Sequence, residues 1–336
     1  MKSENNNIII DAFKKGEVKG LSEFGKIPEY VETQISHVFL FSERVYKIYK
    51  WDNEEFNKNF VNIANINTRT EFYQDDFTWN KYFNEEVHLN LKSVIVNDDN
   101  VLLENRNEIC DDLVIEMKKI NINENLSKLL LNNQLTEEGA HKIGFAIAKL
   151  VAEFPNKPDF NTNYYQVQKV RTEDVGKFIL FAEPLIKKEE SDEIAKLMQK
   201  FIDGKKENLE TIGIDKMVIA IDNHSDNIFY KDGKVSFMDV YPPKKDWLLL
   251  EPLGNIVRPA TDALILGGKP LYDEFLRGYQ DYYKIDTINR ELELYYQIES
   301  AVIRAVLLYD SYKKDGKYKN EADKYWSFVK DKIKFL

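Results

Sequence analysis

The order of apolar and polar residues divides this chain into a first part that contains strands and a longer part that is mainly helical. Residues 55–84 lack Gly and Pro and carry polar side chains throughout, which predicts one long helix. A shorter amphipathic helix is expected over 8–16. Continuous or alternating apolar runs predict a hairpin turned at Ser42-Glu43-Arg44 and three further strands, at 91–96, 101–104 and 112–118.

Helical spacing prevails after residue 118. Thr136 is placed to cap a helix over 137–153, in which apolar residues recur at intervals of three and four. One or two more helices are expected over 172–210, and the pattern is helical again from Leu271 to the end. The second part of the chain is therefore expected to be built mainly from packed helices.

Length and composition favour a globular protein of two lobes. The 336 residues are 43% hydrophobic and 31% charged, which is typical of a folded chain and gives enough length for two lobes. We expect a small mixed N-terminal lobe over 1–118, with a β-sheet and one long helix. A larger, mainly helical C-terminal lobe is expected over 119–336. The predicted fold class is α+β.

Charge and cysteine content exclude several classes of partner. The net charge of −10 argues against general nucleic-acid affinity, because phosphate binding depends on Lys and Arg. Cys110 is the single cysteine, so neither an intrachain disulfide nor a cysteine-based zinc site can form. The first residues lack the apolar length of a signal peptide, and no run approaches the roughly 18 apolar residues of a membrane helix. A cytoplasmic protein without membrane or nucleic-acid partners is expected.

The segment from Asp222 to Asp239 carries the strongest indication of chemistry. Asn227 follows Asp222 by five residues, a hairpin turned at Asp232-Gly233 comes next, and Asp239 stands where that hairpin ends. In phosphotransferases of the kinase fold, one carboxylate accepts a hydroxyl proton, while an amide and a second carboxylate hold Mg²⁺ on the nucleotide phosphates. Asp222 and Asn227 are therefore the candidate catalytic residues, with Asn227 and Asp239 as metal ligands. The alternative is a surface loop with ordinary turn acids.

Lys47 is the candidate for the α- and β-phosphates of the nucleotide. It lies in the second strand of the first predicted hairpin, where strand periodicity points it away from its two neighbours in sequence. An acid from the helix over 55–84 should orient such a lysine, and Asp75 and Asp76 are the best placed. The alternative is an outward-facing lysine on an edge strand.

The end of the strand at 112–118 is the candidate hinge between the lobes. The backbone of Glu116, Met117 and Lys118 would meet an adenine there. The alternative is an ordinary strand end.

These residues resemble a known family. The segment Asp222 to Ile228 is similar to the Gly-Asp-Leu-His-Pro-Gly-Asn-Ile segment of the aminoglycoside phosphotransferase (choline kinase-like) group, with Asp222, His224, Asn227 and Ile228 in register. Further stretches are similar to a bacterial branch of that group, namely 32–40 followed by 44–47, 69–80 and 301–305.

The resemblance implies a bilobal protein-kinase-like fold that uses ATP and Mg²⁺. It also implies transfer to a hydroxyl of a small molecule, such as an aminoglycoside-like compound, an amino alcohol or a sugar. Asp76 stands where the branch usually has Glu, so Asp76 is expected to orient Lys47.

The chain also departs from the family in the catalytic loop and directly after Asp239. Ala220-Ile221 replace the His-Gly that supports the catalytic loop in the family, and no second acid directly follows Asp239, which leaves one or two metal ions open. The main hypothesis is an active ATP- and Mg²⁺-dependent phosphotransferase. The departure at Ala220-Ile221 motivates the alternative, a nucleotide-binding pseudokinase with a regulatory or interaction role. Further alternatives are a protein that binds a small molecule without any nucleotide, and a protein kinase.

Overall fold

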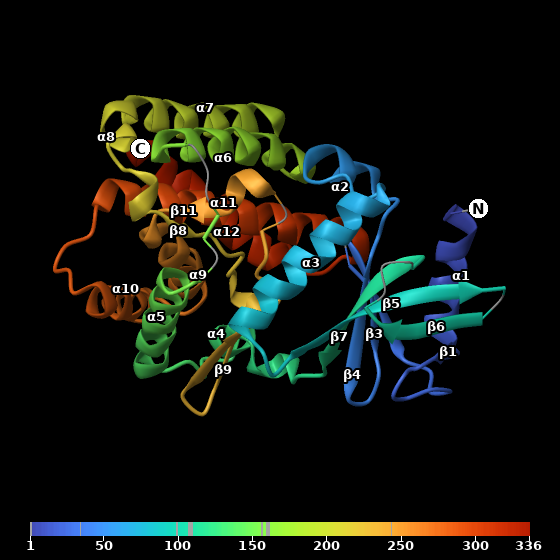
Figure 1. The fold of residues 1–336 in the computed structure, drawn as a ribbon. Coiled ribbons are helices and arrows are strands. Elements are labelled where there is room, and N and C mark those ends of the chain that lie inside the picture. Colours follow the sequence, from blue (N-terminus) through green and yellow to red (C-terminus); the bar gives the residue numbers. More distant parts are fainter. Residues whose placement is uncertain are drawn as a thin grey trace. The chain divides into compact units, whose positions relative to one another are not determined.

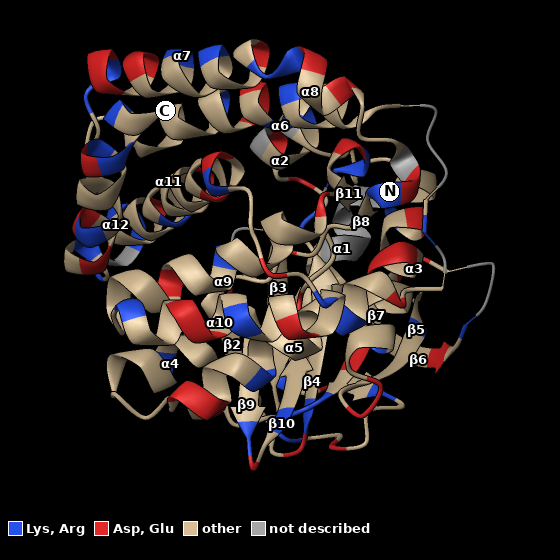
Figure 2. Ribbon diagram, turned by 90° about the vertical axis from the view of Figure 1, so that its left-hand side faces the viewer, with Lys and Arg blue, Asp and Glu red and all other residues tan. Residues whose placement is uncertain are grey.

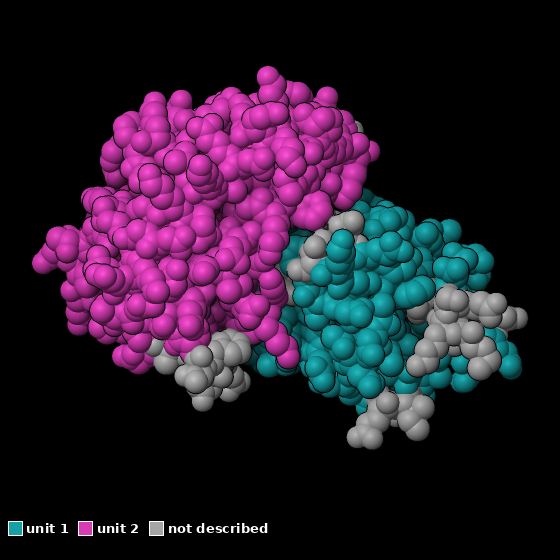
Figure 3. Space-filling view, turned by 90° about the horizontal axis from the view of Figure 1, so that it is seen from above, with its two compact units in different colours: residues 1–122, 236–243 teal, residues 123–235, 244–336 magenta. Residues whose placement is uncertain are grey.

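The computed structural model describes residues 2–33, 35–98, 100–106, 110–155, 157–158, 162–242 and 244–336. Within it the chain forms two compact units (Figure 1). Unit 1 comprises residues 1–122 and 236–243, and unit 2 comprises residues 123–235 and 244–336 (Figure 3). The short segment 236–243 thus lies in the second half of the sequence, but it packs with the residues of unit 1.

Unit 1 is built on a seven-stranded sheet with the order β1-β6-β5-β7-β4-β3-β2. All neighbouring strands are antiparallel except β1 and β6, which are parallel. Its elements are α1 (Lys2–Lys15), β1 (Val18–Lys19), β2 (Glu29–Glu32), β3 (Ser36–Leu40), β4 (Arg44–Tyr49), α2 (Glu54–Asn59), α3 (Ile66–Phe83), β5 (His88–Asn97), β6 (Asn100–Asn105) and β7 (Asp112–Lys118).

Helices cover both faces of this sheet, as strand periodicity requires. Tyr46 and Ile48 point from β4 toward α1 and share a core with Phe13 of that helix. Val45 and Tyr49 point the opposite way, into the core that α3 forms with the sheet. Even- and odd-numbered residues of β4 thus belong to two different cores. Lys47 is odd-numbered, like Val45 and Tyr49, so it lies on the face that α3 covers.

The predicted elements of unit 1 are confirmed, with two differences. The helix expected over 55–84 is two helices, because Asn65 ends the intervening turn and caps α3 by accepting hydrogen bonds from the backbone of Asn67 and Thr68. The helix expected over 8–16 begins earlier, at Lys2.

Unit 2 is mainly helical, which confirms the α+β class and the helical second part of the chain. Thr136 caps α5 as predicted, accepting from Gly139 N at 3.1 Å. Its longer elements are α4 (Leu126–Leu131), α5 (Glu137–Ala152), α6 (Tyr164–Ile179), α7 (Lys188–Gly204), α8 (Lys206–Glu210), β8 (Val218–Ile219), β9 (Ile228–Lys231), β10 (Lys234–Phe237, which runs on into unit 1), β11 (Leu249–Leu250), α9 (Pro252–Leu266), α10 (Lys269–Tyr283), α11 (Arg290–Asp315) and α12 (Lys319–Lys332). Acidic and basic residues both lie along α7, as on a solvated helix face (Figure 2).

Two glycines let α5 and α10 pack unusually closely. A Cβ on Gly144 of α5 would lie 2.2 Å from the backbone oxygen of Phe275 in α10. A Cβ on Gly278 of α10 would lie 2.2 Å from the backbone oxygen of His141 in α5. Both contacts involve backbone atoms, which cannot move aside as a flexible side chain can. Glycine at these positions therefore sets the distance between the two helices.

We expect Gly144→Ala to destabilise the protein, because the added methyl group forces these helices apart. The free energy of unfolding in urea should fall by about 1–3 kcal/mol, the usual cost of overpacking. Gly204→Ala is the matched control, since no atom lies within 4 Å of a Cβ at that helical position. Equal stability of Gly144→Ala and Gly204→Ala would contradict the close packing of α5 and α10.

Candidate functional site

Lys47 is a buried cation in unit 1. Only 7% of its surface is exposed, and its Nζ forms an ion pair with the Asp239 carboxylate. Burial alone lowers the pKa of the Lys47 ammonium, but the negative charges of Asp239 and Asp76 outweigh burial and hold that pKa above its usual value. Lys47 is thus held charged inside the protein by two acids that the sequence had singled out. The edge-strand alternative is wrong, because β4 lies between β3 and β7.

The segment that carries Asp239 is anchored on α3. Phe237 packs edge-on against Phe83 with ring centroids 5.8 Å apart, and Tyr241 packs against Trp79 at 5.5 Å. Between these aromatic contacts Asp239 adopts a φ of 60°, in the left-handed region that Asp tolerates better than most residues. Backbone strain of this kind persists where the surroundings hold it, and it concentrates at functional sites.

Asn80 connects the Asp239 segment with Asp76. Its Nδ2 donates to the Asp76 carboxylate at 2.8 Å, while its Oδ1 accepts from the backbone N–H of Val240 at 2.8 Å. Burial raises the pKa of the Asp76 carboxyl to about 6, although Lys47 opposes this rise. Asp76 therefore acts on Lys47 through its charge, while its carboxylate forms hydrogen bonds with Asn80 and Tyr49. Of the two predicted acids, Asp75 instead accepts from the Tyr241 hydroxyl at 3.4 Å.

Glu116 and Met117 lie within β7, paired on both sides by β4 and β5. Their side chains point to opposite faces of the sheet. The Glu116 carboxylate accepts from Tyr46 and Asn90 on the α1 face, away from Lys47. Met117 belongs to the core on the α3 face. The contact of this backbone with an adenine stays a prediction.

The predicted catalytic loop lies in unit 2, directly after β8. Asp222 and Asn227 are both half-buried. Asn227 donates through Nδ2 to the backbone oxygen of Asp222 at 2.8 Å, which closes the loop on itself. This hydrogen bond uses the amide nitrogen of Asn227. An amide ligates a cation through its other polar atom, the carbonyl oxygen. The hairpin that follows turns at Asp232 and Gly233, both with positive φ, as an Asp-Gly turn requires.

Three polar residues on one face of α9 hold this loop. Asn255 accepts from the backbone N–H of Ile221 at 3.1 Å and donates to Ile219 O at 2.9 Å. Arg258 donates to Ile221 O at 3.1 Å, and Asp262 accepts from Ser225 N at 2.8 Å. These residues were not predicted as site residues. The sequence pattern that could have identified them is their recurrence at intervals of three and four on a helix that is mostly apolar and buried.

Arg304 of α11 fixes the middle of the loop. It donates to Asp226 at 2.9 Å and lies 3.2 Å from Nδ1 of His224. Burial would raise the pKa of the Asp226 carboxyl, but Arg304 and then His224 lower it to about 2. The loop is thus held from α9 and α11, although Ala220-Ile221 stand where the group that the sequence resembles has His-Gly.

The Mg²⁺ ligands expected from the sequence, Asn227 of unit 2 and Asp239 of unit 1, stay a prediction. No group of three or more His, Cys, Asp or Glu residues in the described part of the chain could hold a metal ion. One carboxylate and one amide are typical of Mg²⁺ sites that share the ion with substrate phosphates and water.

None of the described helices combines the length and the apolar character that a membrane span requires.

Comparisons with known proteins agree with the fold. No protein-family model matches the sequence, and no curated protein matches it. Among solved structures, an amicoumacin kinase in complex with AMP-PNP, Ca²⁺ and the compound abbreviated Ami is similar over 100% of this chain and 97% of its own, with a TM-score of 0.56 at 11% identity.

Two further solved structures have the same fold. A choline/ethanolamine kinase family protein from Mesorhizobium loti matches over 99% of this chain and 95% of its own (TM-score 0.54, 9% identity). A choline kinase from Cryptosporidium parvum matches over 98% and 96% (TM-score 0.53, 13% identity). The chain therefore has the fold of small-molecule kinases, and the predicted resemblance is confirmed at the level of the fold.

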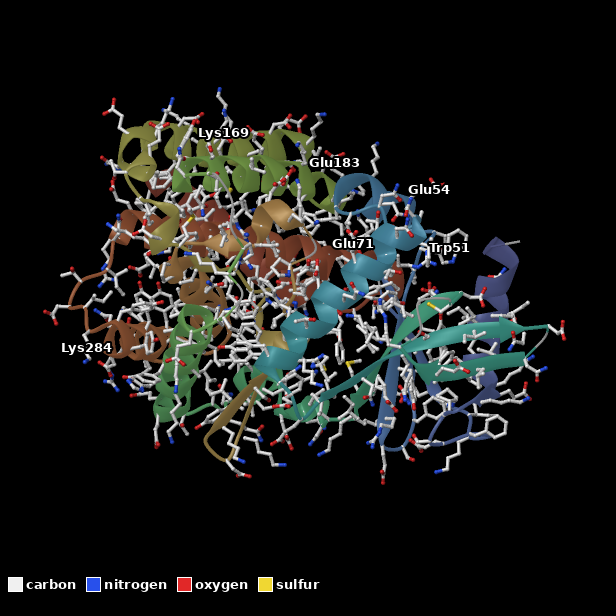
Figure 4. The ribbon with its side chains drawn as sticks, viewed as in Figure 1. Trp51, Glu54, Glu71, Lys169, Glu183 and Lys284 are labelled. Carbon is white, nitrogen blue, oxygen red and sulfur yellow. The ribbon has the colours of Figure 1, made fainter. Side chains whose placement is uncertain are left out.

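Asp76→Asn should remove a pH-dependent loss of stability. Because the pKa of Asp76 is higher in the folded than in the unfolded chain, its contribution to stability is complete below about pH 4 and is lost as the pH rises through about 6. Between about pH 4 and about pH 7, Asp76→Asn should gain about 2–3 kcal/mol of unfolding free energy relative to wild type. Glu71→Gln, an exposed change on α3 (Figure 4), should gain nothing. Parallel pH profiles for Asp76→Asn and wild type would refute this assignment.

Asn255→Ala should loosen the loop, because two buried backbone groups lose their partner. The free energy of unfolding should fall by about 1–3 kcal/mol, and the Ile221 amide should exchange hydrogen faster with solvent. Asn208→Ala, at an exposed position on α8, serves as the control. Unchanged exchange at Ile221 would show that Asn255 does not hold the loop.

Proposed function

We propose that this chain is an ATP- and Mg²⁺-dependent phosphotransferase that acts on a hydroxyl of a small molecule. The observation that carries the proposal is the ion pair between buried Lys47 and Asp239 in unit 1. A phosphoryl-transfer enzyme needs a fixed cation for the phosphates and a nearby carboxylate for the metal ion. These are the two groups that the fold of unit 1 holds together.

In the proposed complex, Lys47 binds the α- and β-phosphates and Asp76 keeps Lys47 charged and oriented. Asp239, with Asn227, holds Mg²⁺, which offsets negative charge on the β- and γ-phosphates. The backbone near Glu116 and Met117 contacts the adenine. Asn227 and Asp239 flank the hairpin in sequence, which supports a common role for them in metal binding.

Asp222 is the proposed base. It accepts the proton of the acceptor hydroxyl as that oxygen bonds to the γ-phosphorus and the bond to the β–γ bridging oxygen breaks, which releases ADP. The hydrogen bonds between the loop and Asn255, Arg258 and Asp262 support an active enzyme, because they hold the loop where His-Gly is absent. Amino alcohols, amino sugars and aminoglycosides are the acceptor classes to test first.

Asp222→Asn should abolish phosphoryl transfer while leaving the affinity for Mg·ATP within about twofold, because a base acts on the transition state and not on nucleotide binding. ADP release should be measured with a panel of choline, ethanolamine, glucosamine and an aminoglycoside. Asp232→Asn is the matched control, since Asn also suits a turn residue with positive φ. It should retain wild-type turnover.

Two outcomes separate this proposal from its alternatives. If wild-type protein binds Mg·ATP but transfers to no acceptor in a broad panel, the pseudokinase hypothesis replaces it. If Mg·ATP gives no thermal stabilisation, the protein is not a nucleotide-binding one and the proposal fails entirely.

A further inference from the structure

Unit 2 contains a cavity of about 650 Å³ that the proposed phosphotransfer does not use. The end of α5, the segment leading into β8, the start of α9 and the end of α10 surround it. Its apolar wall comes from residues that include Val151, Phe154, Ile212 and Pro252. A cavity of this volume is within the range of small-molecule sites.

The cavity is separate from the catalytic loop, although one strand connects them. Val218 and Ile219 of β8 line it, whereas the loop residues from Asp222 to Asn227 do not. β8 pairs with β11, and Glu251, the residue directly after β11, lies in the cavity wall. The cavity is therefore not the place where an acceptor hydroxyl would meet Asp222.

Glu251 places a half-buried carboxyl group in the cavity wall, and no cation among the described residues forms an ion pair with it. Its carboxylate caps α9 by accepting from Leu253 N at 3.0 Å. Burial raises the pKa of this carboxyl to about 7, against two backbone hydrogen bonds that lower it, and no cation among the described residues contributes. An acid buried in this way gains most from a positively charged ligand.

The other polar groups indicate where such a ligand would bind. The buried hydroxyl of Tyr283, at the end of α10, has no hydrogen-bond partner among the described residues and belongs to the cavity wall. Lys157, Asp215 and Lys216 also line the cavity, but all three are exposed, and Lys157 interacts with Asp215. Exposed charges are screened by water, so Glu251 dominates the inner part of the cavity.

We propose that this cavity binds a small organic cation with an apolar or aromatic body. Its ammonium group pairs with Glu251 and donates to the Tyr283 hydroxyl, while its body packs against Val151 and Phe154. This ligand would be distinct from both the nucleotide and the acceptor. Tyr283, at the end of α10, directly precedes Lys284, which Figure 4 labels.

The test is a calorimetric titration with 2-phenylethylamine as the probe. 2-Phenylethanol has the same body without the charge, and 3-phenylpropionate carries the opposite charge. We expect the amine to bind at least tenfold more tightly than either control compound. Glu251→Gln retains an oxygen that can cap α9, and it should weaken the amine at least tenfold while leaving 2-phenylethanol unchanged.

Two further variants keep the proposal falsifiable should Glu251→Gln unfold. Ala152→Trp places a large side chain at an exposed lining position and should block the amine. Tyr283→Phe should weaken it without touching the α9 cap. Unaltered amine binding in Ala152→Trp would place the probe elsewhere, and equal affinity for amine and alcohol would remove the role of Glu251. Tighter binding of 3-phenylpropionate would assign the site to anions through Lys157 and Lys216, and no binding of any probe would also overturn the proposal. Each result is independent of phosphotransferase activity.

Discussion

A lysine that is buried and charged constrains much of unit 1. Removing an ammonium group from water costs several kcal/mol unless carboxylates compensate, so Lys47 requires Asp239 and Asp76 close by. Asp239 reaches it only because the segment 236–243 packs on α3 through aromatic side chains, and Asn80 then links that segment to Asp76. The cost of this arrangement appears in the positive φ of Asp239 and the raised pKa of Asp76. Both fit the proposed nucleotide and metal site, because each group would gain a stronger partner there.

Side chains of a buried helix also hold the predicted catalytic loop in unit 2. There, polar side chains on the buried face of α9 hydrogen-bond the loop backbone, as Asn80 of α3 does for the backbone at Val240. Each helix carries these residues at intervals of three, four or seven among apolar ones. Such helices position a functional segment by its backbone, so the loop sequence itself can vary. These contacts hold the loop although Ala220-Ile221 stand where the group that the sequence resembles has His-Gly.

Local patterns predicted most of the fold. Strand alternation placed Lys47 opposite Tyr46, the Asp-Gly turn placed the second hairpin, and Thr136 marked the start of α5. The break in the long helix was missed because Asn65 can cap a helix or lie within one, and only its hydrogen bonds decide between them. Asn80, Asn255 and Asp262 were missed as site residues because their partners are backbone groups far away in sequence. Their spacing on buried helix faces was visible, but it does not reveal what they bind.

The central claim is that Asp239 and Lys47 together bind a metal-bound nucleotide. Calorimetric titration with AMP-PNP, with and without Mg²⁺, tests this in wild type and in Asp239→Asn, which keeps a residue that tolerates positive φ. We expect Mg²⁺ to tighten binding at least tenfold in wild type and to lose that effect in the variant. The same Mg²⁺ dependence in both proteins would contradict the account.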